Sequence, residues 1–164
     1  MSSTMTTQTF GATTFTTPSD RELLATCAFD APRELIFDAW TDPEHVPHWM
    51  IGPGDWTMPV CEIDLRPGGA WRFEWRGKDG AMEMNGEYKE IARPDRLIST
   101  ENWGGDWPQT LNTLQLTTEN GQTVARCTVR YPSREARDKA ITTGMLQGWA
   151  ASHDKLAEFL RTIL

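Results

Sequence analysis

Apolar residues follow two different spacings in this chain, and the change between them constrains the fold more than any other feature. In the middle, Trp71, Phe73 and Trp75 alternate with charged residues, which is the pattern of a strand with one buried face. After residue 133, apolar residues instead form one helical stripe, made of Ile141, Met145, Trp149, Leu156, Phe159 and Ile163. A one-sided sheet needs a cover, and this helix is the largest candidate. The sequence therefore predicts an α+β fold.

Turn and capping residues divide the chain into about six to seven strands, two short helices and one long C-terminal helix. Asp30 is placed to cap a first helix over 33–40, and a second short helix is expected to follow it. Asn120-Gly121 predicts a hairpin, and Ser133 is the expected N-cap of the long helix. Strands are expected near 21–29, 61–65, 71–75, 82–89, 97–100, 110–118 and 123–131.

Length and charge exclude several classes of protein. A chain of 164 residues suits one domain, and 23 acidic against 16 basic residues, a net charge of −7, argue against a nucleic acid partner. No apolar run reaches the roughly 18 residues of a membrane-spanning helix, and no secretory signal is recognised, so we expect no membrane insertion. Cys27, Cys61 and Cys127 lie far apart, which favours a reduced, cytoplasmic protein.

The start of the chain has a different composition from the rest. Residues 1–19 contain eight threonines and no charged side chain. They show no sustained periodicity, so we expect a flexible tail over 1–19, followed by a single domain over 20–164. The stretch from Thr13 to Thr17 could extend the first strand of that domain.

Tryptophan is unusually abundant, with eight residues in the chain, and seven methionines accompany it. Large rings at this density either fill a core or line a cavity for an apolar molecule. Gly144 and Gly148 each weaken the long helix by about 1 kcal/mol relative to alanine, so we expect them to allow close packing on the sheet or to leave volume beneath the helix. The predicted ligand-binding residues are Trp40, Trp49, Trp71, Phe73, Trp75, Met84, Tyr88, Trp103, Trp107, Met145 and Trp149.

Residues with catalytic or metal-binding chemistry form no recognisable motif. His45 and His48 lie three positions apart, but no second pair of ligands supports a metal site. Strand alternation places Glu62 and Asp64 opposite the apolar face, where we expect a solvated surface or an ion pair beside the turn. His153 is expected to face solvent. We therefore predict no catalytic residue, no metal and no cofactor.

Several stretches of the sequence resemble one family. The run from Phe29 to Glu44, FDAPRELIFDAWTDPE, resembles the opening of bacterial proteins of the activator of Hsp90 ATPase homologue 1-like family, within the START-like (SRPBCC, Bet v 1-like) superfamily. The resemblance covers roughly residues 21–162 and continues through 64–73, 86–91, 94–97, 144–149 and 156–160. It implies a helix-grip fold, in which a curved antiparallel sheet wraps around a long C-terminal helix and a hydrophobic cavity lies between them.

The resemblance and the aromatic residues together predict non-catalytic binding of a small hydrophobic or aromatic molecule, oriented by polar groups such as Tyr88, His48 or Asn112. One alternative is an enzyme, because relatives in the superfamily cyclise or dehydrate polyketide-like substrates; it requires ionisable groups with shifted pKa values in the cavity. The other is a protein-interaction module, such as a chaperone cofactor. Chaperone contact is poorly supported, because the eukaryotic activator uses a separate N-terminal domain for much of it, whereas here only residues 1–19 precede the domain.

Overall fold

The computed structural model describes residues 7–164; residues 1–6 of the expected tail lie outside the described part. The strands are β1 (Thr7–Phe10), β2 (Thr13–Ser19), β3 (Glu22–Phe29), β4 (Thr57–Ile63), β5 (Ala70–Gly77), β6 (Gly80–Ala92), β7 (Arg96–Glu101), β8 (Thr110–Glu119) and β9 (Gln122–Arg130). The helices are α1 (Arg33–Thr41), the 3-10 turn η1 (Val46–His48), α2 (Arg134–Ile141) and α3 (Met145–Ile163). Neighbouring strands are antiparallel, in the order β1-β2-β3-β9-β8-β7-β6-β5-β4.

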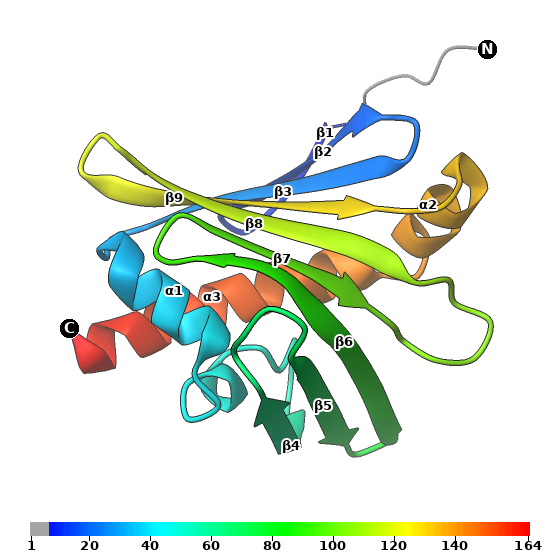
Figure 1. Ribbon diagram of the computed structural model, residues 1–164, viewed down its shortest axis with the longest axis horizontal. Helices are drawn as coiled ribbons and strands as arrows, with labels where there is room; N and C mark the ends of the chain where they lie inside the picture. The colour runs from blue at the N-terminus through cyan, green and yellow to red at the C-terminus, as the bar shows by residue number, and fades with distance from the viewer. Residues whose placement is uncertain (1–6) are drawn as a thin grey trace.

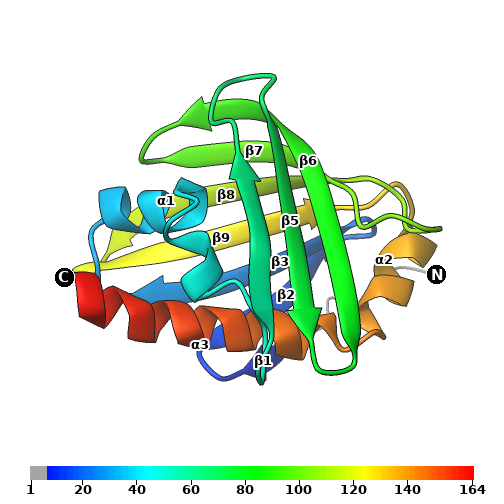
Figure 2. The same cartoon turned by 90° about the horizontal axis from the view of Figure 1, so that it is seen from below.

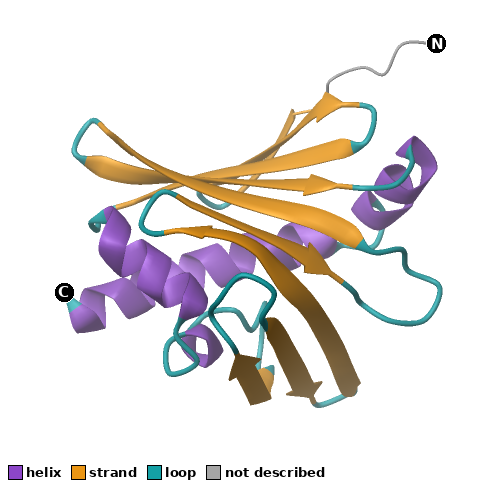
Figure 3. Ribbon diagram, in the orientation of Figure 1, coloured by secondary structure: helices purple, strands orange, loops and turns teal. Residues whose placement is uncertain are grey.

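The sheet bends around the C-terminal helix. In Figure 1, its β4–β6 end curves away from its β1–β3 end, and α3 runs along the concave side. Seen from below, β4, β5 and β6 run across the line of α3 (Figure 2). The two short helical segments α1 and η1 lie at one end of the sheet, and α2 lies at the other (Figure 3). This arrangement confirms the predicted α+β helix-grip fold, with nine strands in the described residues.

Residues 7–19 form two strands instead of the expected tail. β2 pairs with β3, and its Thr13 and Phe15 side chains are buried. Threonine suits this position, because a β-branched side chain favours extended backbone and packs well on a half-buried surface. The extra hairpin of β1 and β2 explains why more strands are present than predicted. The boundary expected at residue 20 therefore does not separate a tail from the sheet.

The two helix starts differ in how they are capped. The Ser133 hydroxyl accepts a hydrogen bond from the Ala136 amide at 3.1 Å, which confirms the predicted N-cap, although the helix that it caps is the short α2. The prediction for Asp30 is wrong, because α1 begins after Pro32 without a side-chain cap. The Asp30 carboxylate instead accepts a hydrogen bond from the Gln122 side chain at 2.8 Å, which ties the start of α1 to β9.

Positive φ angles mark two turns in the second half of the chain. Asn120 and Gly121 have φ angles of 53° and 78° and form the predicted hairpin between β8 and β9. Gly144 has a φ of 84° and separates α2 from α3, so the single long helix expected from residue 133 is two helices. A Cβ on Gly148 would meet Pro53 at 3.9 Å, so this glycine faces a loop. The expectation that both glycines shape the space between helix and sheet is therefore wrong.

Buried side chains on the concave side form two clusters. The larger one includes Trp71 and Leu156, and it joins β3–β9 and α1 to the C-terminal half of α3. The smaller one includes Phe15 and Leu146, and it joins β2 and β3 to α2 and the start of α3. Cys127 of β9 packs against both clusters. The candidate site is found along the larger cluster, at the aromatic residues of β5 and the neighbouring strands.

Candidate functional site

Three aromatic side chains of β5 line the concave side of the sheet, and we call them the aromatic wall: Trp71, Phe73 and Trp75. All three are buried, and neighbouring ring centroids lie 4.8 Å and 5.9 Å apart. They share a face because successive side chains of a strand point to opposite sides. On β6, Met84 lies opposite Phe73, and both Met84 and Tyr88 are buried. Five of the predicted site residues therefore lie together.

Trp103 extends the aromatic wall from a different part of the chain. It lies in the loop between β7 and β8, and its ring stacks on Trp75 with centroids 5.6 Å apart and planes 14° apart. Its indole Nε1 donates a hydrogen bond to the Glu101 carboxylate at 2.7 Å. Trp103 is 39% exposed, so one side of the ring is open to solvent. Trp103 therefore connects the aromatic wall to the Glu101 carboxylate at the end of β7.

Four polar side chains of β7 and β8 lie on the same concave side, and we call them the polar quartet: Ser99, Glu101, Thr110 and Asn112. Ser99 is opposite Asn112 and Glu101 is opposite Thr110 in the antiparallel register. The Thr110 hydroxyl donates to Asn112 Oδ1 at 3.1 Å, and the Asn112 amide donates to Glu101 Oε2. Their alternation with outward-facing residues places them on the face of the buried Leu97 and Leu114.

Gly86 of β6 lies where the aromatic wall meets the polar quartet. It pairs with Trp71 on one side, and the register on the other side places it opposite Glu101. A Cβ on Gly86 would lie 2.6 Å from Trp71 Cε2 and Cζ2, so the indole covers this glycine. The Trp71 Nε1 is buried and has no hydrogen-bond partner among the described residues. An unused donor therefore lies one strand away from the carboxylate.

The environment of Glu101 favours its neutral form. Burial raises the pKa of the carboxyl, and the hydrogen bonds from Trp103 and Asn112 oppose this effect. None of the ion pairs formed by residues 7–164 includes Glu101. Burial, with the charges of Cys27 and Glu101, also raises the pKa of the Cys127 thiol to about 12, so this thiol is protonated at neutral pH.

Three other predicted residues gather around His153, away from the aromatic wall. Trp40 and Trp49 have ring centroids 4.6 Å apart, and Trp149 lies 6.2 Å from the imidazole. The prediction that His153 faces solvent is wrong, because the side chain is 1% exposed and its Nδ1 lies 2.9 Å from the Thr13 hydroxyl. Burial lowers the pKa of His153 to about 4, so the imidazole is neutral at pH 7.

The last two predicted residues lie apart from the aromatic wall. Trp107 is 37% exposed, and the ammonium of Lys139 lies 5.1 Å from its ring centroid. Met145 begins α3, and its sulfur accepts a hydrogen bond from the Tyr131 hydroxyl at 3.7 Å. Trp107 therefore lies at the surface, whereas Met145 joins the start of α3 to Tyr131, the residue that follows β9.

Side chains on the concave side of the middle strands keep some solvent exposure although α3 covers this side. Ser99, Glu101, Asn112 and Cys127 are half-buried, and so is Trp149 on α3. Two hollows lie elsewhere. One of about 210 Å³ is lined by Gln8, Phe15, Thr16, Thr17, Leu23, Arg137, Asp138, Ile141 and Leu146. An open groove of about 610 Å³ is lined by Arg33, Ala92, Asp95, Arg96, Gln115, Leu116, Thr117, Thr118 and Arg126. Neither contains a predicted site residue.

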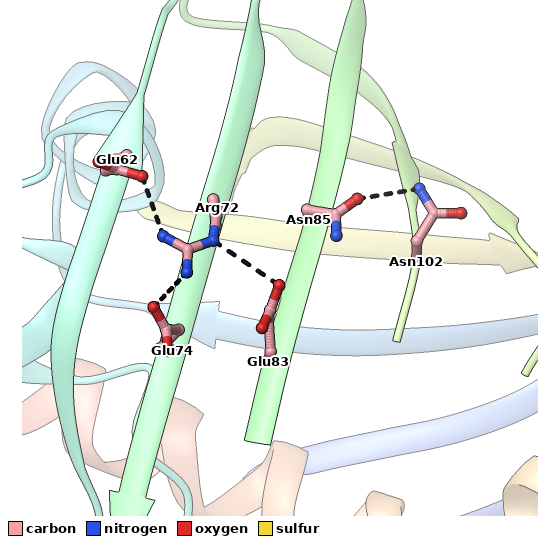
Figure 4. A network of polar contacts seen from close by, with 6 residues as sticks. All are labelled: Glu62, Arg72, Glu74, Glu83, Asn85 and Asn102. Atoms are coloured by element: carbon pink, nitrogen blue, oxygen red, sulfur yellow. Dashed lines mark hydrogen bonds and ion pairs between the residues drawn. The ribbon is translucent and has the colours of Figure 1, made fainter. Parts of the chain in front are cut away.

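The acidic residues near the turn before β5 lie on the convex side, as predicted. Glu62 pairs with Arg72 at 3.3 Å, and Glu74 and Glu83 contact the same guanidinium (Figure 4). Farther along the same figure, the side chains of Asn85 and Asn102 are joined by a hydrogen bond. Asp64 forms an ion pair with Arg66 at 2.8 Å. These carboxylates therefore stabilise the surface and do not face the aromatic wall.

The two neighbouring histidines pack against one ring of α3. His48 stacks on Phe159 with centroids 4.8 Å apart, and His45 meets the same ring edge-on at 5.4 Å. Within residues 7–164, no group of three or more His, Cys, Asp or Glu side chains is arranged to hold a metal ion. None of the helices found in this range has the length and hydropathy to cross a membrane.

Glu101 is a candidate site residue that the sequence analysis missed. The strand was predicted to end at Thr100, so Glu101 was assigned to the following loop. β7 in fact includes Glu101, which lies opposite Thr110 of β8. The period-two pattern of Leu97 and Ser99, continued by one step, would have placed Glu101 on the concave side.

Comparisons with known proteins agree with this architecture. The protein-family model described as Activator of Hsp90 ATPase homolog 1-like protein matches residues 30–161. The crystal structure of a protein from Rhodobacter sphaeroides is 28% identical with a TM-score of 0.85, and the match covers 92% of this chain and 99% of that chain. A comparison with curated proteins gives no match.

Two further structures are more distant. A protein from Mycobacterium smegmatis is 24% identical with a TM-score of 0.78, over 86% of this chain and 91% of that chain. A protein from Nitrosomonas europaea is 23% identical with a TM-score of 0.77, over 87% of this chain and 96% of that chain. At these identities the similarity establishes the fold alone.

Proposed function

The chain belongs to the activator of Hsp90 ATPase homolog 1-like family, and on this premise we propose that it binds a small hydrophobic or aromatic molecule between the concave side of the sheet and α3. Domains of this family and fold are in general of ligand-binding or cyclase type. The proposed site has the aromatic wall and Trp103 on one side and the polar quartet on the other. Apolar burial supplies most of the affinity of such a site, and a few polar groups fix the orientation of the ligand.

The observation that carries this proposal is the incomplete burial of three residues of the polar quartet. Polar groups that are buried for the sake of the fold are normally hydrogen-bonded. Here Ser99, Glu101 and Asn112 stay half-buried beneath α3, and the Nε1 donor of Trp71 has no partner in the described part of the chain. Unused polar groups beside large apolar surfaces are what a binding site for a mostly apolar molecule requires.

Binding should appear as a change in tryptophan fluorescence and as added thermal stability. We expect one class within a panel of flavonoids, polyketides, fatty acids and sterols to give a saturable change, because Trp71, Trp75 and Trp103 line the site. A ligand present at 100 times its Kd adds about 2.7 kcal/mol to the free energy of unfolding. If no compound of the panel changes the fluorescence or the thermal stability, the proposal is contradicted and a protein partner is favoured instead.

A pair of variants locates the binding. Ser99→Leu places a larger apolar side chain within the polar quartet, at the proposed site, and should abolish the response. Thr17→Leu changes a lining residue that lies on the same face of β2 as the buried Phe15, so it fills the 210 Å³ hollow between β1–β3 and the two C-terminal helices and should leave the response unchanged. The reverse result would move the ligand to that hollow. Circular dichroism of both variants checks that each is folded.

A second candidate function is an enzyme of the polyketide cyclase or dehydratase type, and Glu101 is the observation that favours it. Burial raises the pKa of this carboxyl, and a raised pKa suits a group that donates a proton during a reaction. Mass spectrometry of panel members incubated with the protein tests this candidate. A new product that is lost with Glu101→Gln supports catalysis, and unchanged compounds contradict it.

A further inference from the structure

We propose that the bound molecule carries a protonated amine, and that Glu101 pairs with this amine while Trp103 and Trp75 hold the adjoining apolar part. The inference rests on the proposed function and names the class of its ligand, an amphipathic organic cation. Three features of the described residues support it: the unused acceptors of Glu101, the stacked rings beside it, and the placement of basic side chains.

Glu101 has acceptor capacity that the protein does not use. Its Oε1 accepts from Trp103 at 2.7 Å and its Oε2 accepts from the Asn112 amide. A carboxylate offers about four acceptor positions, so roughly half remain available. Neither donor is charged, and among residues 7–164 no ion pair compensates the carboxylate. Because an uncompensated charge is costly in a half-buried position, a cation from the ligand would stabilise the ionised form.

The aromatic rings around Glu101 suit the same kind of ligand. Trp103 and Trp75 stack with centroids 5.6 Å apart, and the Trp103 nitrogen contacts the carboxylate directly. The faces of tryptophan rings attract organic cations, and they bind the apolar part of an amphipathic molecule equally well. Trp103 is partly exposed and lies in a loop, so its ring can admit a ligand against Trp75 without disturbing the sheet.

Among the described residues of β6 to β9, no basic side chain lies on the concave side to pair with an anionic ligand; Lys89 of β6 pairs with Glu87 at 2.9 Å. The strands nearest to the polar quartet contain three arginines, Arg96, Arg126 and Arg130, and strand alternation places all three on the convex side. Arg96 pairs with Glu90 at 2.7 Å, and Arg126 pairs with Glu119 at 2.7 Å. The net charge of −7 also attracts cations to the chain and repels anions.

Three probes with one naphthalene body test the inference on the unchanged protein. They are naphthylethylamine, naphthylethanol and naphthylacetate, which carry a positive, a neutral and a negative group. We expect the amine to bind at least about tenfold more tightly than the alcohol at pH 7, and the carboxylate to bind most weakly, as measured by tryptophan fluorescence titration. This comparison does not depend on any variant folding.

A matched pair of substitutions assigns the preference to one carboxylate. Glu101→Gln keeps an acceptor for Trp103 or Asn112 but removes the charge, so the advantage of the amine should disappear while alcohol binding changes by less than about twofold. Glu83→Gln removes the same charge from the convex side and should leave the preference as it is.

The outcomes separate this inference from the proposed function. Equal binding of amine and alcohol to the unchanged protein would overturn the inference and leave hydrophobic binding intact. A preference for the amine that survives in Glu101→Gln would also overturn it. Binding of none of the probes, together with silence across the wider panel, would overturn the proposed function itself.

Discussion

Replacing Gly86 with alanine should destabilise the protein by about 3 kcal/mol, the upper part of the usual range for overpacking a core. A Cβ at this position would lie 2.0 Å from the backbone oxygen of Thr100 and 2.6 Å from the Trp71 ring. The carbonyl belongs to the neighbouring strand and cannot rotate away, so β6, β7 or the indole must shift. Urea denaturation followed by circular dichroism measures the loss, and tryptophan emission reports the displacement of Trp71.

Gly148→Ala is the matched control for this prediction. Its added Cβ would meet only Pro53 at 3.9 Å, and the residue lies inside α3, where alanine favours the helix by about 1 kcal/mol over glycine. We therefore expect the control to be neutral or stabilising. Equal losses in the two variants would mean that the close approach of Trp71 and β7 at Gly86 does not limit this part of the fold.

The parts of the fold that could be predicted are those where the contrast between buried and exposed residues is local. Trp71, Phe73 and Trp75 alternate with charged residues, so five consecutive positions define the strand and its buried face. β2 lacks that contrast, because threonines occur on both of its faces and the two faces therefore have similar polarity. Thr13 and Phe15 are buried by β3 and α3, which come later in the chain. The local sequence around β2 contains no pattern that predicts these contacts.

The candidate site could be predicted only in its aromatic half, for a related reason. The aromatic wall follows from strand period, whereas Glu101 lies one residue beyond the predicted end of its strand, and its hydrogen-bond partners come from β8 and from the loop after β7. Trp40, Trp49 and Trp149 were predicted to belong to the same site as the aromatic wall on the basis of their residue type alone. The structure places Trp40, Trp49 and Trp149 around His153. The His153 imidazole is hydrogen-bonded to Thr13, which lies 140 positions earlier in the sequence.

Acidification should destabilise the protein through His153. Burial lowers its pKa from 6.5 to about 4. In the unfolded chain this imidazole takes up a proton below pH 6.5, whereas in the folded chain it stays neutral until about pH 4. Folding stability is therefore unaffected by this group above pH 6.5 and falls as the pH drops between these values, by roughly 3 kcal/mol in total.

The contribution of His153 is isolated by comparison with His153→Asn, whose side-chain oxygen can take the place of Nδ1 beside Thr13 but does not titrate. Urea denaturation at intervals from pH 7.5 to 4 should show a steep loss of stability in the wild type and a shallower one in the variant. The lowered pKa values of Glu90 and Glu119 also reduce stability in acid, but they act at lower pH and equally in both proteins. If the free energy of unfolding depends on pH in the same way in the two proteins, the prediction is wrong. The His153 imidazole would then reach a proton acceptor or solvent in the folded state, which requires the cluster of rings around it to open readily.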